Sequence, residues 1–249
     1  MSNRSLIDTD SDRFVIEYLS PVLRQKLNTS PMQWTDLQNE CLKEYHEQGG
    51  TGDKIRESLK KIPLDSKMIQ VCQLLYSKGW VLAIVSDANQ VYIEGILEHY
   101  GIRNLFSAII TNPAFWDVQG RLHIQRLIPA DGIPHGCPSG VCSLNICKGQ
   151  EVDKLLLRLG NDSQAGGAVE SFGHAGVPIR MLYVGDGRND YCPALRTKSP
   201  QDIYFVRKGR SLEKYLNMAD APEIRRAIRA RIVYWDKAGE ILSELQSTL

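Results

Sequence analysis

The chain has 249 residues, 43% of them hydrophobic, which is enough for one large α/β domain or two small ones. Its 30 basic and 29 acidic side chains nearly cancel, which argues against nucleic acid or an anionic membrane surface as a partner. No stretch approaches the roughly 20 apolar residues of a membrane span, and the polar start is unlike a signal peptide, so a soluble cytoplasmic protein is expected.

Residues 11–78 carry helix start and stop signals at regular intervals. Small polar residues and a first-turn proline are typical of helix starts, and glycines are typical of helix ends. The candidate boundaries are a start at Ser30 and Pro31, an end at Gly49 and Gly50, caps at Thr51 and Ser66, and an end at Gly79. The pattern predicts a small unit of three helices that leads into a fourth.

Beyond this unit, apolar runs alternate with amphipathic stretches. The predicted strands are residues 81–85, 108–111, 181–184 and 203–206, and the predicted helices between them are 91–100 and 152–159. Such alternation predicts right-handed βαβ crossovers and a parallel sheet covered on both faces, which is an α/β fold. Residues 160–176 are rich in Gly, Ala and Ser, which predicts a flexible surface insertion.

An apolar strand runs directly into two carboxylates in the stretch Met-Leu-Tyr-Val-Gly-Asp-Gly-Arg-Asn-Asp, residues 181–190. Gly185 and Gly187 allow a sharp turn around Asp186, so Asp186 and Asp190 are expected at the carboxyl end of a strand, where open α/β sheets hold ligands. Hard oxygen ligands at such an edge suit Mg²⁺. The peptide alone is equally compatible with a turn whose acids cap the next helix.

Two further stretches offer groups that could bind phosphate. Ser86, Asp87 and Asn89 follow an apolar strand, where a hydroxyl and adjacent backbone amides could hold a phosphoryl group, although a helix cap is the alternative. Lys148 stands where a helix begins, so its ammonium and the helix amino terminus could meet an anion together. The alternative for Lys148 is a solvated surface lysine.

The six cysteines are too few in a chain of this size to demand a disulfide framework, so reduced thiols are expected. Cys137, Cys142 and Cys147 are spaced Cys-x4-Cys-x4-Cys, and His135 lies nearby. Three thiols and an imidazole could form a Zn²⁺ site, although this spacing is looser than the usual clip of two to four residues. The sequence leaves open whether these residues bind zinc.

The order of strand with Ser86, helix with Lys148 and strand with Asp186 resembles the second to fourth motifs of the haloacid dehalogenase-like hydrolases. At a finer level the chain resembles the phosphoethanolamine/phosphocholine phosphatase family, whose plant and fungal relatives include pyrophosphatase-like members. The stretches that carry this resemblance are residues 84–102, 111–115, 135–148, 183–193 and 206–209. Together they extend it over about residues 5–241.

This resemblance implies a Rossmann-like parallel-sheet core, residues 1–12 and 76–249, with a small helical cap, residues 13–75, inserted after the first motif. It implies a small phosphorylated substrate and Mg²⁺ as cofactor, with Asp12 and Asp87 facing a cationic head group. The implied site residues are Asp186 and Asp190 for the metal, Ser86 and Lys148 for catalysis, and Asp12, Asp87 and Asn89 for substrate binding.

The first motif of the family, Asp-x-Asp-x-Thr, is where this sequence departs. Aligning residues 6–12 on the acidic segment that follows it places Ser5 on the threonine, Asn3 on the second aspartate and Met1 on the nucleophilic aspartate. Neither catalytic carboxylate is present, so we expect a core without its first strand and a 249-residue chain that is inactive. An alternative register, in which residues 8–12 themselves form the first motif, lacks a preceding apolar strand.

Two functions follow from the resemblance. The leading hypothesis is an Mg²⁺-dependent phosphatase of small phosphorylated metabolites, of the phosphoethanolamine, phosphocholine or pyrophosphate type, whose gene model is truncated and lacks the nucleophilic aspartate. The alternative is a catalytically inactive relative that binds a phosphorylated ligand or a protein partner.

Overall fold

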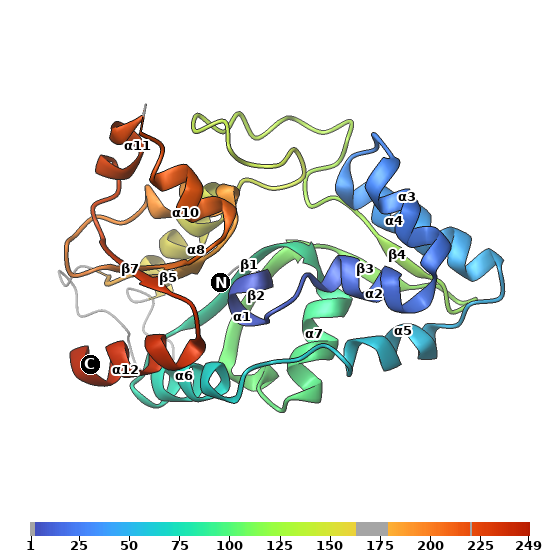
Figure 1. Cartoon of the computed structure of the whole chain (residues 1–249), viewed down its shortest axis with the longest axis horizontal. Coiled ribbons are helices and arrows are strands. Elements are labelled where there is room, and N and C mark those ends of the chain that lie inside the picture. The colour runs from blue at the N-terminus through green and yellow to red at the C-terminus, as the bar shows by residue number, and fades with distance from the viewer. Residues whose placement is uncertain (1–2, 163–178, 220) are drawn as a thin grey trace.

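The computed structural model describes residues 3–162, 179–219 and 221–249, and its strands form three groups (Figure 1). A parallel pair consists of β1 (Leu82–Asn89) and β2 (Phe106–Asn112). A parallel three-stranded sheet contains, in spatial order, β5 (Leu182–Gly185), β6 (Ile203–Arg207) and β7 (Arg231–Trp235). An antiparallel hairpin consists of β3 (Ala114–Trp116) and β4 (Leu122–Ile124).

Helices precede, separate and follow these strands. Those of the amino-terminal half are α1 (Asn3–Leu6), α2 (Ser11–Leu19), α3 (Pro21–Thr29), α4 (Trp34–Glu47), α5 (Gly52–Leu59), α6 (Ser66–Ser77) and α7 (Gln90–His99). Those of the carboxyl-terminal half are α8 (Lys148–Asp162), α9 (Tyr191–Ala194), α10 (Ser211–Leu216), α11 (Pro222–Arg226) and α12 (Ala238–Thr248). Among the described residues, no helix has the length and apolar character needed to cross a membrane.

The helical segment contains more helices than the sequence predicted. Residues 11–78, all of which are described, form five helices rather than three that lead into a fourth. The helix expected to begin at Ser30 and Pro31 begins at Trp34, because the side-chain carbonyl of Gln33 accepts hydrogen bonds from the amides of residues 35 and 36, at 2.7 and 3.2 Å. The amide of Ser30 instead closes α3.

The other predicted boundaries hold with one exception. Thr51 caps α5 by accepting a hydrogen bond from the amide of residue 54, and Gly49 and Gly79 follow α4 and α6 with φ angles of 85° and 79°. Asp65 rather than Ser66 caps α6, since its carboxylate accepts a hydrogen bond from the amide of residue 67 at 2.8 Å. A carboxylate one residue earlier therefore takes the role that was predicted for the hydroxyl.

The predicted strands and helices of the core are all present, most of them longer than predicted. The structure adds the β3–β4 hairpin, β7 and the helices α10 to α12, for which no prediction was made. The hairpin strands have three residues each, too few to show a period, and Asp117 shapes their turn by accepting hydrogen bonds from the amides of residues 119 and 121. Residues 163–176 of the expected flexible insertion lie outside the described part of the chain.

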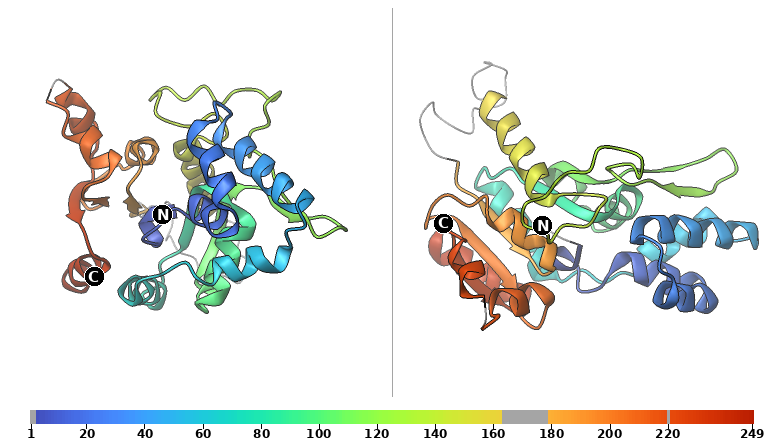
Figure 2. Two further views of the ribbon diagram at one scale, coloured as in Figure 1. Left: turned by 45° about the vertical axis from the view of Figure 1, so that its right-hand side comes forward. Right: turned by 90° about the horizontal axis from the view of Figure 1, so that it is seen from above.

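The two parallel sheets are not hydrogen-bonded to each other within the described residues, and α1 lies between them, in contact with β1 and β5 (Figures 1 and 2). Leu6 and Ile7, at the end of α1, belong to the same apolar cluster as Ile84 of β1 and Val184 of β5. Apolar packing therefore joins the sheets where hydrogen bonding does not. The first core strand is absent from the described chain, as predicted.

The strands β1, β5 and β6 are buried along most of their length, as is usual for parallel strands covered by helices, whereas β2 and β7 are only half-buried. Val85 and Tyr183, the neighbours of Ile84 and Val184, point to a second apolar cluster that includes Val152 of α8. Seen from above, α2 to α5 lie at one end of the molecule and the β5–β7 sheet lies at the other (Figure 2). Most of α6 belongs to the predicted cap, yet this helix packs against α12 and β1 of the predicted core. The division between core and cap at residue 75 therefore stays a prediction.

The turn after β5 can be tested through Gly185. An added Cβ there would lie 2.7 Å from Cβ of Asp190 and 2.9 Å from the hydroxyl of Tyr204. Gly185→Ala is expected to lower the free energy of unfolding by about 1–3 kcal/mol, measured by urea denaturation. Gly160→Ala, in α8 with nothing within 4 Å of the added carbon, is the matched control and should raise stability by about 0.5 kcal/mol. Equal stability of the two variants would contradict the proposed crowding.

Candidate active site

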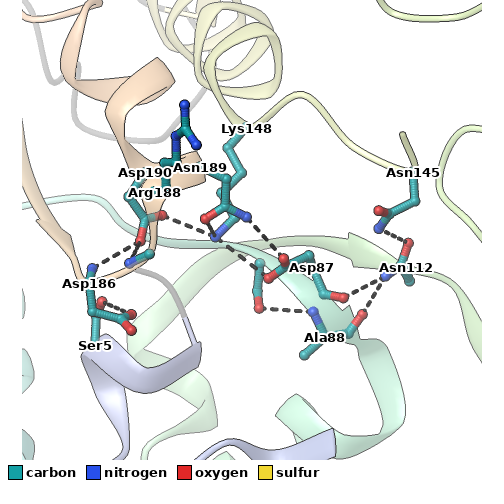
Figure 3. A network of polar contacts seen from close by, with 12 residues as sticks. Ser5, Asp87, Ala88, Asn112, Asn145, Lys148, Asp186, Arg188, Asn189 and Asp190 are labelled. Atoms are coloured by element: carbon teal, nitrogen blue, oxygen red, sulfur yellow. Dashed lines mark hydrogen bonds and ion pairs between the residues drawn. The ribbon is translucent and has the colours of Figure 1, made fainter. Parts of the chain in front are cut away.

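Polar residues from β1, from the start of α8 and from the turn after β5 form one network (Figure 3). Nζ of Lys148 donates a hydrogen bond to Oδ1 of Asp190 at 3.0 Å and lies 3.6 Å from Oδ1 of Asp87. Nδ2 of Asn189 donates to Oδ2 of Asp87 at 2.9 Å. The carboxyl ends of β1 and β5 are therefore linked through side chains, and three predicted site residues meet there.

Lys148 is buried, with 1% of its side chain exposed, so it is not the solvated surface lysine of the alternative interpretation. Burial by itself lowers the pKa of Lys148. The negative charges of Asp190 and Asp87 and the hydrogen bond to Asp190 outweigh that effect and hold the pKa above its ordinary value. Lys148 therefore keeps a full positive charge at neutral pH, inside the protein.

Asp190 is fully buried, and both of its carboxylate oxygens accept hydrogen bonds. Oδ2 accepts from the amides of Asp186 and Gly187, at 3.0 and 2.9 Å, and Oδ1 accepts from Lys148 and from the hydroxyl of Tyr183, each at 3.0 Å. Burial and the charge of Asp190 raise the pKa of Tyr183 well above its usual value, so its hydroxyl stays a donor. Asp190 thus fixes the turn and the lysine, and a metal ion bound to it would compete with these bonds.

Asp186 lies at the end of β5 with 5% of its surface exposed. Its Oδ1 accepts a hydrogen bond from the hydroxyl of Ser5 at 3.0 Å. Ser5 is the residue that the sequence alignment placed on the threonine of the first motif, so the two motifs meet as the alignment requires. Met1 lies outside the described residues.

The donor set beside Asp186 agrees in part with Mg²⁺. The ion is usually held by one or two carboxylates, with waters and substrate oxygens completing its shell, and Asp186 offers a hard oxygen of this kind. Ser5, at the position of the motif's threonine, adds a hydroxyl at the same place. Within the described residues the site therefore supplies one suitable carboxylate.

Two carboxylates of the alternative register take part in structural contacts. The carboxylate of Asp8 forms an ion pair with Arg207 of β6. Asp10 caps α2, since its Oδ1 accepts a hydrogen bond from the amide of residue 13 at 3.1 Å. The choice between the two registers stays a prediction.

Ser86, at the carboxyl end of β1, is fully buried. Its hydroxyl accepts a hydrogen bond from the amide of Ala88 at 3.1 Å, which shapes the end of the strand. Ser86 also borders a cavity whose other lining residues, among them Leu6 and Ile7, are apolar. The cavity thus extends from Ser86 toward α1.

The three predicted substrate-binding residues, Asp12, Asp87 and Asn89, line a single pocket. Oδ2 of Asp12 accepts a hydrogen bond from the indole of Trp34 at 2.9 Å. Oδ1 of Asn89 accepts from the amide of residue 92 and so caps α7, as the alternative interpretation held, but Nδ2 of Asn89 is buried and has no hydrogen-bond partner among the described residues. The structure therefore brings the three predicted residues together at one pocket, and their role in substrate binding stays a prediction.

Two residues of α4, Thr35 and Gln38, complete this pocket and were missed by the sequence analysis. Both amide atoms of Gln38 are buried without a hydrogen-bond partner in the described part of the chain. Such groups are costly to leave unpaired, but the pocket as described has no room for a water-sized molecule, so they do not by themselves indicate a ligand. Thr35 and Gln38 are three residues apart and so lie on one face of α4. This spacing predicts that both side chains are buried together, but it does not predict a binding site.

Asn112 and Asn145, also missed, fix the end of β1 from behind (Figure 3). Nδ2 of Asn112 donates to the carbonyls of Asp87 and Ala88, at 2.7 and 2.8 Å, and Oδ1 of Asn112 accepts from Nδ2 of Asn145 at 3.0 Å. Asn112 is the last residue of β2, and Asn145 precedes α8. Their amides hold the backbone of Asp87 in position.

Comparison with solved structures defines the class of fold. The chain is similar to a phospho-aspartyl intermediate analogue of phosphoserine phosphatase, with a TM-score of 0.54 and 12% identity over 98% of this chain and 95% of that one. It is also similar to a HAD family hydrolase from Salmonella enterica, with a TM-score of 0.53 and 13% identity over 86% and 62% of the two chains. The predicted haloacid dehalogenase-like α/β fold is confirmed.

The chain belongs to the family described as "Putative Phosphatase", which matches residues 2–249. It is 35% identical over 208 residues to inorganic pyrophosphatase 1 of Arabidopsis thaliana, covering 83% of this chain and 65% of that protein. It is 35% identical over 255 residues to the thiamine phosphate phosphatase-like protein of the same plant, covering 99% and 94%. With mouse pyridoxal phosphate phosphatase PHOSPHO2 it shares 27% over 254 residues, covering 98% and 94%.

The family resemblance that the sequence motifs indicated is therefore confirmed. The chain belongs to a phosphatase family and has a haloacid dehalogenase-like fold. The chain spans just under two thirds of the first pyrophosphatase but almost the whole length of the other two relatives.

The ion pair between Lys148 and Asp190 can be tested by a double-mutant cycle. Lys148→Met leaves a buried carboxylate without its counter-charge and is expected to lower the free energy of unfolding by about 3–5 kcal/mol. Adding Asp190→Asn should recover part of that loss, because the uncompensated charge is then gone. Urea denaturation of the four proteins gives the coupling energy. Strict additivity of the two single changes would contradict a direct ion pair.

Proposed function

We propose that this chain has the framework of an Mg²⁺-dependent phosphatase of small phosphorylated metabolites, of the phosphoethanolamine, phosphocholine or pyrophosphate type. The observation that carries the proposal is the buried ammonium of Lys148, held by Asp190 and Asp87 at the carboxyl ends of β1 and β5. A buried cation at this edge of a parallel sheet suits an anionic phosphoryl group. The similarity to a pyrophosphatase and to phosphate-ester phosphatases supports it.

In the proposed mechanism, Lys148 and the hydroxyl of Ser86 hold the phosphoryl oxygens and stabilise the charge that shifts during transfer. Asp186 provides a carboxylate ligand for Mg²⁺, which when bound neutralises charge on the phosphoryl group. Asp190 acts through its neighbours, because it fixes both Lys148 and the turn that carries Asp186.

Phosphoryl transfer in this fold family needs a nucleophilic carboxylate and a second acid next to Asp186. The alignment places Met1 and Asn3 at the positions of these two acids, and neither residue has a carboxylate that could attack phosphorus or exchange a proton. We therefore propose that the 249-residue chain does not turn over phosphate esters. The proposed active form carries, in the place of α1, a strand that ends in two aspartates.

The assay that tests this uses two chains and p-nitrophenyl phosphate. The 249-residue chain with Mg²⁺ is expected to show no turnover above background. A chain in which residues 1–5 are replaced by an apolar strand ending in Asp-x-Asp-x-Thr is expected to turn over the ester. That turnover should be lost on chelation of Mg²⁺ and in Asp186→Asn.

The matched control for the replacement carries Asn-x-Asn-x-Thr and should fold without activity. Turnover by the unmodified chain that is abolished by Asp10→Ala would overturn both the register and the proposed inactivity.

A second candidate function is a non-catalytic protein that binds a phosphorylated ligand. It is favoured by Ser5 beside Asp186, together with the retained cation and polar pocket. Calorimetric titration of the unmodified chain with phosphocholine separates the two. Binding without turnover, even after the strand replacement, supports the binding protein rather than the enzyme.

The head-group preference can be tested at Asp12 in the strand-replaced chain. Asp12→Asn removes a negative charge from the pocket but keeps an oxygen that can accept from Trp34. The KM for phosphocholine is expected to rise roughly tenfold, which is the effect of losing one charge-assisted contact. The KM for pyrophosphate is expected to stay unchanged, because pyrophosphate has no cationic group. An equal rise for both substrates would contradict a role in recognising the cation.

A further inference from the structure

Four cysteine side chains meet at one place, close to the proposed active site but not part of its network. The Sγ atoms of Cys137, Cys142, Cys147 and Cys192 all lie within 4.8 Å of one another. The first two belong to the loop before α8, the third directly precedes α8, and the fourth lies in α9. We propose that these four thiolates bind one structural Zn²⁺ ion.

The spacing of the sulfur atoms fits a tetrahedral zinc site. A Zn–S bond of about 2.3 Å in a tetrahedron places neighbouring sulfurs about 3.8 Å apart. Sγ of Cys192 lies 3.5 Å from Sγ of Cys137 and 3.7 Å from Sγ of Cys147. A disulfide needs a separation of about 2.05 Å, and all six cysteines of the chain are free.

The fourth ligand differs from the one that the sequence suggested. The sequence offered His135 as a candidate fourth ligand, but Nδ1 of its ring accepts a hydrogen bond from the amide of Cys137 at 3.0 Å, and Nε2 contacts the carbonyl of Ser143 at 2.9 Å. The imidazole thus shapes the loop that carries the cysteines. Cys192 takes the fourth place, which short-range spacing could not reveal because it lies 45 residues beyond Cys147.

The surroundings of Cys192 provide room and charge for the site. A Cβ on Gly149 would lie 2.5 Å from Sγ of Cys192, so only glycine at that position allows the sulfur to approach α8 this closely. A zinc ion with four thiolates carries two negative charges, since 2 − 4 = −2. Arg196 lies beside it, with Nη1 3.6 Å from Sγ of Cys192, and is itself held by Asp153 through Nε at 3.0 Å.

The site would have no open coordination position, because four protein ligands fill a tetrahedron, and its role is therefore structural. Cys147 directly precedes Lys148, and Cys192 follows Asp190 by two residues. A zinc ion would thus fasten the two segments that carry the buried ion pair. This inference concerns the fold around the pair, so it does not depend on whether the chain hydrolyses phosphate esters.

The test measures the metal content of the full chain purified without a chelator, by mass spectrometry of the elements. About one equivalent of zinc per chain is expected, and Cys142→Ala should remove it. Cys72→Ala, a buried cysteine outside the cluster, is the matched control and should keep the zinc. Replacement of the zinc by Co²⁺ should give the thiolate charge-transfer and d–d bands of a tetrahedral sulfur site, a readout that needs no variant.

Several results would overturn the proposal. These are less than about a tenth of an equivalent of zinc in the wild-type chain, a mass lowered by the two hydrogens of a disulfide, or iron in place of zinc. Unchanged zinc in Cys142→Ala would also contradict it. None of these readouts depends on turnover, so failure of the zinc site and failure of the proposed phosphatase function are distinguishable.

Discussion

The buried ion pair between Lys148 and Asp190 is the interaction on which the arrangement of this molecule depends. The two parallel sheets share no backbone hydrogen bonds among the described residues, so side chains must align them. Lys148 begins α8 and also reaches Asp87 of β1, while Asp190 binds the amides of the turn after β5. One charge pair therefore sets the distance between β1, α8 and β5, and apolar packing of α1 completes the connection.

The charges around Lys148 do not cancel within the protein. One ammonium faces the carboxylates of Asp87, Asp186 and Asp190, all of which raise its pKa. The local excess of negative charge is unfavourable when these groups are removed from water, and a divalent cation would relieve it. This balance agrees with the proposed Mg²⁺ site and explains why the framework of the centre persists beside Ser5.

Buried polar residues around the pocket differ in whether their side chains are hydrogen-bonded. Asn112 lines the pocket and, with Asn145, engages its amide with backbone carbonyls and with its neighbour, so the two position β1. Gln38 and Asn89, in contrast, keep buried polar atoms without partners among the described residues, on the wall of the pocket. Unpaired buried groups are costly, so these atoms weigh against the stability of the described arrangement.

The sequence by itself determined β1, β2, β5 and β6, the turn around Asp186 and the order of the motifs, because apolar runs and glycine turns act over a few residues. It also located Lys148 and three of the four clustered cysteines. Only the tertiary structure decided that Cys192 joins them, that Thr35 and Gln38 line the pocket, and that α1 lies between two separate sheets. These features depend on contacts between segments far apart in the chain, which local periodicity and capping do not encode.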